Sequence, residues 1–531
     1  MNSTALLHEL VTASALRAGE RPALSAAGKH LSYAELASQC EAFAGGLSAL
    51  GLGRSERVAI YLDKRPEFVI AAFGTAAAGG CFVPLNPLLK PEQVGHILRD
   101  CNVRVLVTSS ERLALLAPAL PACHELRQII LCGEAAPQPA CPGPAVHSWQ
   151  EVLDGAATRH QRVIDSDMAA ILYTSGSSGQ PKGVVLSHRN LVTGAQSVAH
   201  YLGNHADDSL LAALPLSFDA GFSQLTTAFH SGARVVLLNY LLPRDVLKAV
   251  TQERITGLTA VPPLWIQLAR LDWPEDTDQH LRYFASTGGR MPLDTLQALR
   301  KRLPRSKPFL MYGLTEAFRA TYLPPEQVDQ RPDSIGQAIP NAEILVLRED
   351  GSECAANEAG ELVQRGPLVA LGYWNDAERT AERFRPLPPS LRPHGEGLML
   401  PEIAVFSGDT VRRDEEGYLY FIGRRDEMIK TSGYRVSPTE IEEVLYATQL
   451  VGECAAFGLP DPERGQCIHA VVTPAGQAPL DRSALLAACR ARMPAYMLPA
   501  HLEIRSGPLP RNPNGKIDRQ ALAAAAAKEF R

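Results

Sequence analysis

The chain has 531 residues, a length that suggests roughly three or four structural units at about 150 residues each. With 46% hydrophobic, 21% charged and 6% aromatic residues it is an ordinary globular protein rather than a disordered or fibrous one. Its formal net charge of -5 leaves no basic excess, which argues against nucleic acid as a partner. The 10 cysteines include no CxxC pair, so we expect reduced, buried thiols and no zinc site.

The amino terminus predicts an amphipathic helix rather than a secretion signal, because it lacks a basic start and carries His8 and Glu9 within its apolar stretch. We therefore expect a cytoplasmic protein. The longest apolar run, 68–85, contains the break Gly79–Gly80 and Pro84. It predicts a buried helix followed by a strand, and no membrane span.

Strand and helix patterns alternate through the first part of the chain. The β-rich runs lie at 57–62, 103–109, 128–133, 233–239 and 307–313, and helical stretches lie at 91–100, 243–254 and 292–304. This rhythm predicts an α/β fold built of βαβ units on largely parallel sheets. Sites in such folds lie on loops beyond the carboxyl ends of the strands.

Short, turn-punctuated strands follow residue 345 and indicate a small antiparallel β subdomain with DG and EG turns. The remaining segments predict a small α+β unit. We expect an N-terminal domain over 1–425, with the β subdomain at 345–425, and a mobile C-terminal domain over 426–531. The Pro- and Gly-rich segment 386–401 predicts a loop.

A run of hydroxyls and glycines follows the apolar strand at 171–174, in the string ILYTSGSSGQPKG. Glycines let backbone N–H groups approach an anion, hydroxyls add donors, and a lysine supplies a cation. The predicted phosphate-binding residues are Thr174, Ser175, Gly176, Ser177, Ser178, Gly179 and Lys182. Gly183 stands where the GxxxxGK[ST] motif needs Ser or Thr, which disfavours a P-loop phosphotransferase. A flexible turn is the structural alternative.

The same string resembles the signature loop of the adenylate-forming superfamily: acyl-CoA synthetases, peptide-synthetase adenylation domains and luciferases. The resemblance implies a ligase that uses ATP and Mg²⁺ to convert a carboxylic acid into its acyl-AMP with release of pyrophosphate. It also implies transfer of the acyl group to an acceptor. CoA and a carrier-protein thiol are the favoured acceptors, and the amine of an amino acid is the alternative.

Further family motifs follow in order. The string MYGLTEA at 311–317 resembles the YGxTE segment, which implies that Tyr312 packs on adenine beside Gly313, Thr315 meets the phosphate and Glu316 holds magnesium. The implied metal ligand agrees with chemistry, because Mg²⁺ usually binds one or two carboxylates together with substrate phosphates. Alone, this segment would be a strand-end turn.

The segment 406–433 resembles the nucleotide and hinge motifs of the family. FSGDT implies that Asp409 accepts the ribose hydroxyls, and GRRDEMIKTSG implies that Arg424 contacts the nucleotide. The same resemblance implies that Asp426 is the pivot between domains and that Gly433 borders the acceptor tunnel. Without these neighbours, a charged stretch of this kind indicates a solvated surface.

The string LPRNPNGKIDR resembles the family's PxxxxGKxxR segment, which implies that Lys516 bridges the acid's carboxylate and the α-phosphate. Adenylation brings two anions together, so positioning and cations carry most of the catalysis. We expect Thr174, Lys182, Glu316 and Lys516 to be the catalytic residues. Transfer requires withdrawal of Lys516, so rotation about Asp426 is the expected gating step.

Segments 215–232 and 284–291 resemble the walls of the family's acid pocket. The implied pocket residues are Phe218, Asp219, Ser223, Ala285, Thr287, Gly288, Met311 and Arg319. Asp219 stands where amino-acid-activating members bind the α-amine, and it also occurs in members that use other acids. Arg319 is either a ligand for a polar oxygen or a structural ion-pair partner.

Longer strings, among them MYGLTEAFRATYLPPE and RPDSIGQAIPNAEI, resemble one bacterial subgroup. It includes exosortase-associated acyl-CoA ligases, stand-alone prolyl carrier-protein ligases and coronafacic-acid amide ligases. The competing function is a catalytically silent member that binds ligands. Lys182, Glu316, Asp409 and Lys516 are all present, which favours an active enzyme.

Overall fold

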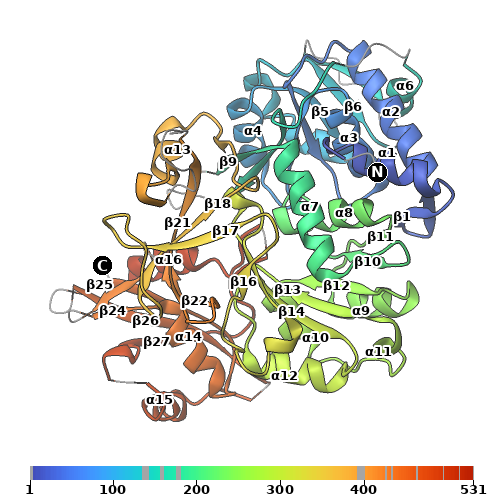
Figure 1. Cartoon of the computed structure of the whole chain (residues 1–531). Coiled ribbons are helices and arrows are strands. Elements are labelled where there is room, and N and C mark those ends of the chain that lie inside the picture. Colours follow the sequence, from blue (N-terminus) through green and yellow to red (C-terminus); the bar gives the residue numbers. More distant parts are fainter. Residues whose placement is uncertain are drawn as a thin grey trace.

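The structure is a computed structural model of the chain (Figure 1). It describes residues 4–133, 143–155, 161–174, 181–391, 401–424, 427–431, 434–461, 465–476, 478–493, 495–513 and 515–529. The described residues form four sheets, and two of these are long and largely parallel.

The first large sheet has eight strands. They are β3 (Arg57–Tyr61), β4 (Cys81–Pro84), β5 (Val103–Thr108), β6 (Gln128–Leu131), β7 (Ala145–Ser148), β8 (Met168–Thr174), β9 (Lys182–Ser187) and β19 (Gly372–Tyr373). Their order is β19-β9-β8-β4-β3-β5-β6-β7. All neighbours from β8 to β7 are parallel, whereas β9 runs antiparallel to both β8 and β19.

The second large sheet has nine strands. They are β1 (Pro22–Ala26), β2 (Lys29–Ser32), β10 (Ser209–Ala212), β11 (Arg234–Leu237), β12 (Gly257–Ala260), β13 (Tyr283–Ser286), β14 (Lys307–Tyr312), β15 (Thr321–Leu323) and β16 (Gln337–Ala338). Their order is β16-β15-β14-β13-β12-β10-β11-β1-β2. The strands from β14 to β1 are parallel, so their carboxyl ends lie at one edge.

Two smaller sheets follow. The third is antiparallel and contains β17 (Glu343–Leu347), β18 (Ala359–Arg365), β20 (Phe384–Pro386), β21 (Ile403–Arg413) and β22 (Leu419–Arg424). The fourth contains β23 (Ile429–Thr431), β24 (Tyr434–Val436), β25 (Val451–Asp461), β26 (Gly465–Pro474) and β27 (His501–Ile504). In the third sheet, Gly417 takes the left-handed conformation at the predicted EG turn between β21 and β22.

Helices surround these sheets. They are α1 (Glu9–Ala18), α2 (Tyr33–Ala49), α3 (Pro66–Ala77), α4 (Pro91–Asp100), α5 (Ser110–Leu116), α6 (Trp149–Leu153), α7 (His188–Leu202), α8 (Asp219–Ser231), α9 (Pro243–Gln252), α10 (Pro262–Leu268), α11 (Thr277–His280), α12 (Leu293–Arg302), α13 (Ala377–Arg383), α14 (Pro438–Ala447), α15 (Arg482–Arg490) and α16 (Arg519–Glu529). Local sequence fixes several ends. Ser32 and Ser187 close capping boxes at the starts of α2 and α7, and Gly203 ends α7 in the left-handed conformation.

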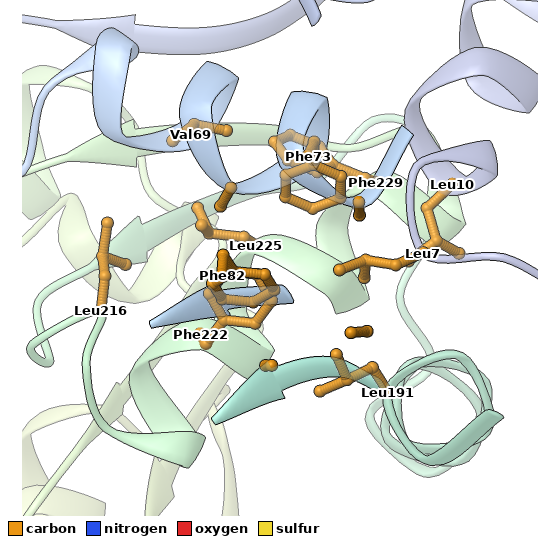
Figure 2. Packing of buried hydrophobic residues seen from close by; sticks show 14 of the residues in the cluster. Leu7, Leu10, Val69, Phe73, Phe82, Leu191, Leu216, Phe222, Leu225 and Phe229 are labelled. Atoms are coloured by element: carbon orange, nitrogen blue, oxygen red, sulfur yellow. The ribbon is translucent and has the colours of Figure 1, made fainter. Parts of the chain in front are cut away.

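The main core lies where α3 and α8 meet the first sheet (Figure 2). Phe73 of α3 stacks on Phe222 of α8, with ring centroids 5.9 Å apart, and Phe222 lies 4.8 Å from Phe82 of β4. All three side chains are fully buried. Replacing one such ring with alanine typically costs about 3–5 kcal/mol. This packing holds the two large sheets, and hence their strand ends, in a fixed arrangement.

The carboxyl-terminal unit has its own core. Helices α14 and α16 both pack on β25, and α14 also contacts β22 of the antiparallel sheet. In Figure 1 this unit, orange to red, lies beside the antiparallel sheet. The predicted domain boundary at 425 and 426 falls outside the described residues, so it stays a prediction.

The predicted fold class is confirmed: parallel α/β sheets, an antiparallel β subdomain and a small C-terminal domain. The apolar run 68–85 is α3 followed by β4, and the amino-terminal helix is α1. No helix among the described residues is long and apolar enough to cross a membrane. The nine cysteines within the described ranges are buried, as predicted, and Cys141 lies outside those ranges.

Candidate active site

One large cavity, of about 1410 Å³, lies at the carboxyl ends of the parallel strands. Residues at or just beyond the ends of five strands line it. After β4, β10, β13 and β14 these are Asn86, Asp219, Thr287 and Arg319, and at the end of β8 it is Thr174. The carboxyl-terminal unit closes it. Because parallel strands end together, residues from distant parts of the chain meet here, as the α/β pattern predicts.

A charged network lies at the end of the cavity that Thr174 and Lys182 line. Lys182 Nζ donates to Glu316 Oε1 and to the Tyr373 hydroxyl, each at 2.8 Å, and the Tyr373 hydroxyl donates to Glu316 Oε1 at 2.6 Å. The Lys182 ammonium also lies 4.4 Å from the centroid of the Tyr373 ring. Burial raises the pKa of Glu316, but the charge and hydrogen bond of Lys182 outweigh it and lower that pKa to about 2.

Thr174 ends β8 and begins the predicted phosphate loop. Its hydroxyl is buried and has no hydrogen-bond partner among the described residues. Ser175, Gly176, Ser177, Ser178 and Gly179 lie outside the described residues. An unsatisfied hydroxyl beside the Lys182 ammonium fits a phosphate ligand.

The donor set also fits magnesium held mainly by phosphate. The described residues include no group of three or more His, Cys, Asp and Glu side chains that could hold a metal ion by themselves. Glu316 brings one carboxylate to the cavity, beside Lys182. A single carboxylate suffices where substrate phosphates and water supply the other oxygen ligands.

Three residues predicted to bind the nucleoside lie together. The Tyr312 hydroxyl donates to Asp409 Oδ2, and Arg424 Nε donates to Asp409 Oδ1 at 3.1 Å. Asp409 is buried on β21, whereas the side chain of Arg424 is 47% exposed. Burial raises the pKa of the Tyr312 phenol, and the charge of Asp409 raises it further, so the hydroxyl stays a donor. Gly313 and Thr315 line the same cavity.

The predicted acid-pocket residues divide into two groups. Those that line the cavity are Phe218, Asp219, Thr287, Gly288, Met311 and Arg319. Ser223 and Ala285 are not among the cavity-lining residues in the described part of the chain. Ser223 lies one turn deeper in α8 and faces Thr227, with the two hydroxyls 3.5 Å apart, and Ala285 packs in the main core.

Lys516 enters the cavity from the carboxyl-terminal unit. Its Nζ lies 5.8 Å from the centroid of the Phe218 ring. A Cβ on Gly288, which has φ +79, would lie 3.0 Å from Lys516 Cε, so the absence of a side chain there leaves room for the lysine stem. Burial lowers the pKa of Lys516, while the charges of Asp219 and Asp409 raise it. Lys516 thus reaches the cavity that Thr174 and Lys182 line.

The loop that carries Lys516 is braced from both sides. Asn86 Nδ2, from the loop after β4, donates to the Pro513 carbonyl at 2.6 Å, and Asn86 Oδ1 accepts from Leu88 N at 2.9 Å. Within the loop, Arg511 Nη1 donates to the Gly515 carbonyl at 2.9 Å. Sequence reasoning missed Asn86, because a lone Asn after a strand carries no motif.

Tyr373 was also missed. It lies on β19, which pairs with β9 and so brings the phenol to Lys182. The aromatic GYW string was the only local signal. The predicted hinge residue Asp426 and the predicted tunnel residue Gly433 lie outside the described residues.

The chain matches two family models. A model described as AMP-binding enzyme matches residues 11–374, and one described as AMP-binding enzyme C-terminal domain matches residues 440–516. The first match spans more than half of the chain, so the protein belongs to the AMP-binding, adenylate-forming enzyme family. It is an ATP-dependent, AMP-forming acid ligase.

Relatives match over nearly their whole length. A feruloyl-CoA synthase from an Amycolatopsis species is 31% identical over 497 residues, 92% of this chain and 93% of that protein. An L-proline–[L-prolyl-carrier protein] ligase from Streptomyces coelicolor is 31% identical over 506 residues, 93% and 91% of the two chains. The solved structure of an O-succinylbenzoate CoA synthetase from Bacillus subtilis, in complex with ATP and a magnesium ion, has a TM-score of 0.80 and 26% identity. It covers 97% of this chain and 98% of that one.

Proposed function

We propose that this enzyme activates a small-molecule carboxylic acid as its acyl-AMP and transfers the acyl group to the thiol of CoA or of a carrier protein. One observation carries the proposal: Lys516, from the carboxyl-terminal unit, lies in the same cavity as Thr174, Lys182 and Glu316. Cations from two separate parts of the chain therefore converge on one space, which suits a reaction between two anions.

The residues at the nucleotide end take the following proposed roles. Thr174, the 175–179 loop and Lys182 bind the phosphates of ATP, and Glu316 holds the magnesium ion that neutralises them when bound. Asp409 and Arg424 bind the ribose and nucleotide, and Tyr312, Gly313 and Thr315 line the adenine and phosphate wall. In the structure Tyr312 and Arg424 already hydrogen bond to Asp409, which orients its carboxylate.

The first half-reaction joins the acid to AMP. A carboxylate oxygen attacks the α-phosphorus, the bond from that phosphorus to the bridging oxygen breaks, and pyrophosphate leaves. Lys516 neutralises the charge that builds up between the carboxylate and the α-phosphate. The positive charge that this lysine brings into the cavity favours binding of anions there.

The second half-reaction transfers the acyl group. A thiolate attacks the carbonyl carbon of the acyl-AMP and AMP leaves as the thioester forms. Lys516 must first withdraw, so we propose that the carboxyl-terminal domain rotates about Asp426 and that Gly433 borders the path by which the acceptor enters.

The thiol acceptor is supported by the relatives, which include a feruloyl-CoA synthase and a prolyl-carrier protein ligase. The sequence resemblance to coronafacic-acid amide ligases supports the second candidate, transfer to the amine of an amino acid. Both candidates share the first half-reaction, and only the acceptor differs.

A two-stage assay tests the proposal. The full chain is incubated with ATP, Mg²⁺ and a varied set of carboxylic acids, and acyl-AMP is measured by mass spectrometry. CoA, a pantetheine-bearing carrier protein and amino acids are then added separately. We expect acyl-AMP in the first stage and a thioester in the second. Amide product would favour the second candidate, and absence of acyl-AMP with every acid would reject both.

A further inference from the structure

An ion pair lies buried at the acid end of the cavity. Arg319 Nη1 lies 3.5 Å from Asp219 Oδ2, and each side chain is only 4% exposed. Asp219 is the first residue of α8, and Arg319 follows β14 by a short loop. Because the two charges oppose each other, the pair presents little net charge to the cavity.

The pair is incompletely satisfied. Asp219 Oδ1 and Arg319 Nε are buried and have no hydrogen-bond partner among the residues that the structure describes. Ser217 and Ser286 line the same cavity, and their hydroxyls are likewise buried without a hydrogen-bond partner among the described residues. Buried polar groups almost always have partners, and all four of these residues line the cavity, so a ligand group that reaches this wall could supply the missing hydrogen bonds.

The backbone that aims Arg319 is strained. Phe318 is fully buried and has φ 55 and ψ -43, a conformation that a bulky residue rarely adopts. Packing maintains it: a Cβ on Gly194 of α7 would lie 2.3 Å from Phe318 Cδ1, so the ring occupies the space that this glycine leaves. Gln364 Nε2 also donates to the Arg319 carbonyl at 2.8 Å. The structure therefore holds Arg319 toward the cavity rather than letting it relax.

We propose that the acid substrate carries, near its reacting carboxylate, a neutral group that both donates and accepts a hydrogen bond, such as a hydroxyl or a carboxamide, and that this group bridges Asp219 Oδ1 and Arg319 Nε. This inference rests on the proposed function. The position follows from Lys516, which would meet the carboxylate: it interacts with the charge of Asp219 and lies over the neighbouring Phe218.

Other end groups fit the pair less well. An ammonium would satisfy Asp219 but face the Arg319 guanidinium, and an anion would satisfy Arg319 but face the Asp219 carboxylate. A methyl group would leave both buried atoms unpaired. Sites built to hydrogen bond a substrate group reject most strongly the analogues that lack that group. The neutral polar group alone pairs with both.

Two matched acid series test the inference. One series consists of substituted propanoic acids and the other of substituted benzoic acids. Within each series the substituent at one fixed position is methyl, hydroxyl, carboxamide, ammonium or sulfonate, and kcat/KM for acyl-AMP formation is measured for each acid. The hydroxyl or carboxamide member should exceed the methyl and charged members by at least about tenfold. A methyl or charged member that reacts best overturns the inference while leaving the proposed function intact. If no acid of any kind forms acyl-AMP, the proposed function fails and the inference fails with it.

A double variant gives a second test. Asp219→Leu with Arg319→Met replaces the pair with apolar side chains of similar size, a change that buried ion pairs often tolerate. The methyl member should then react better than the hydroxyl member, and an unchanged order would overturn the inference. The ratio of kcat/KM for the methyl and hydroxyl acids is measured on one preparation of each variant, so a loss of folded protein lowers both values equally and leaves the ratio unchanged. Thr227→Val, also on α8 and buried away from the cavity, is the matched control and should keep the wild-type ratio.

Discussion

The two ends of the cavity differ in how their polar groups are satisfied. At the nucleotide end, Lys182, Glu316 and Tyr373 form a closed network of hydrogen bonds. At the acid end, Asp219 and Arg319 meet at 3.5 Å and each keeps a buried atom without a partner in the described part of the chain. The charged side chains of the nucleotide end are thus paired with each other, and the Thr174 hydroxyl is the group there that lacks a partner among the described residues. Unpaired atoms suit a ligand whose own groups complete the site.

Lys516 serves both ends, so its removal should have the largest effect. We expect Lys516→Ala to reduce acyl-AMP formation by about 10²–10³-fold, because Lys516 brings a cation from the carboxyl-terminal unit into the cavity that Thr174 and Lys182 line. Acid-dependent exchange of labelled pyrophosphate into ATP measures this step.

A matched experiment separates chemistry from folding. The same variant should still bind ATP and should still transfer the acyl group from synthetic acyl-AMP to the thiol acceptor. Unchanged pyrophosphate exchange would remove Lys516 from the mechanism.

Breaking the nucleotide end should have the next largest effect. Glu316→Gln removes a carboxylate that both pairs with Lys182 and is the proposed ligand of magnesium. We therefore expect the rate of pyrophosphate exchange to fall by about 10²-fold. The magnesium concentration needed for half-maximal rate should rise. Tyr373→Phe deletes only the hydroxyl bonded to the same two side chains, and it should cost less than about tenfold. Equal losses in the two variants would show that the network acts only as a structural support.

The two ends should also titrate differently. Burial raises the pKa of Asp219 despite the opposing charge of Arg319, whereas Lys182 holds the pKa of Glu316 at about 2. As the pH falls, Asp219 therefore takes up a proton while Glu316 stays ionised, and Arg319 is left as an uncompensated cation. A sulfonate-bearing acid should then gain severalfold relative to its hydroxyl counterpart as the pH is lowered. Asp219→Asn should abolish this change, because the ratio would no longer depend on a titrating group at this position.

Local sequence patterns account for much of the fold and of the nucleotide end. Lys182, Glu316, Asp409 and Lys516 lie in short strings with recognisable spacing, and each lines the cavity or hydrogen bonds to a residue that does. Tyr373 could not be predicted in this way. It reaches Lys182 only because β19 pairs with β9, strands that are distant in the sequence.

The acid end shows the same limit. Asp219 and Ser223 are one helical turn apart, yet only Asp219 lies at the strand ends, and the sequence does not say how deep each turn of α8 is buried. The strain at Phe318 was equally invisible, because it depends on the space above Gly194 in another helix.

The brace on the Lys516 loop should have the smallest effect. Asn86→Ala removes the hydrogen bond to the Pro513 carbonyl, and one such bond contributes about 0.5–1.5 kcal/mol, so adenylation should slow by roughly two- to twelvefold. Transfer from synthetic acyl-AMP should keep its rate, because Lys516 is expected to have withdrawn by then. Asn86→Asp is the sharper variant: it keeps the size and the acceptor for Leu88 N but loses the donor, so it should slow adenylation at least as much as alanine does. If both half-reactions slow equally in either variant, Asn86 supports the fold of the loop after β4 rather than the docking of Lys516.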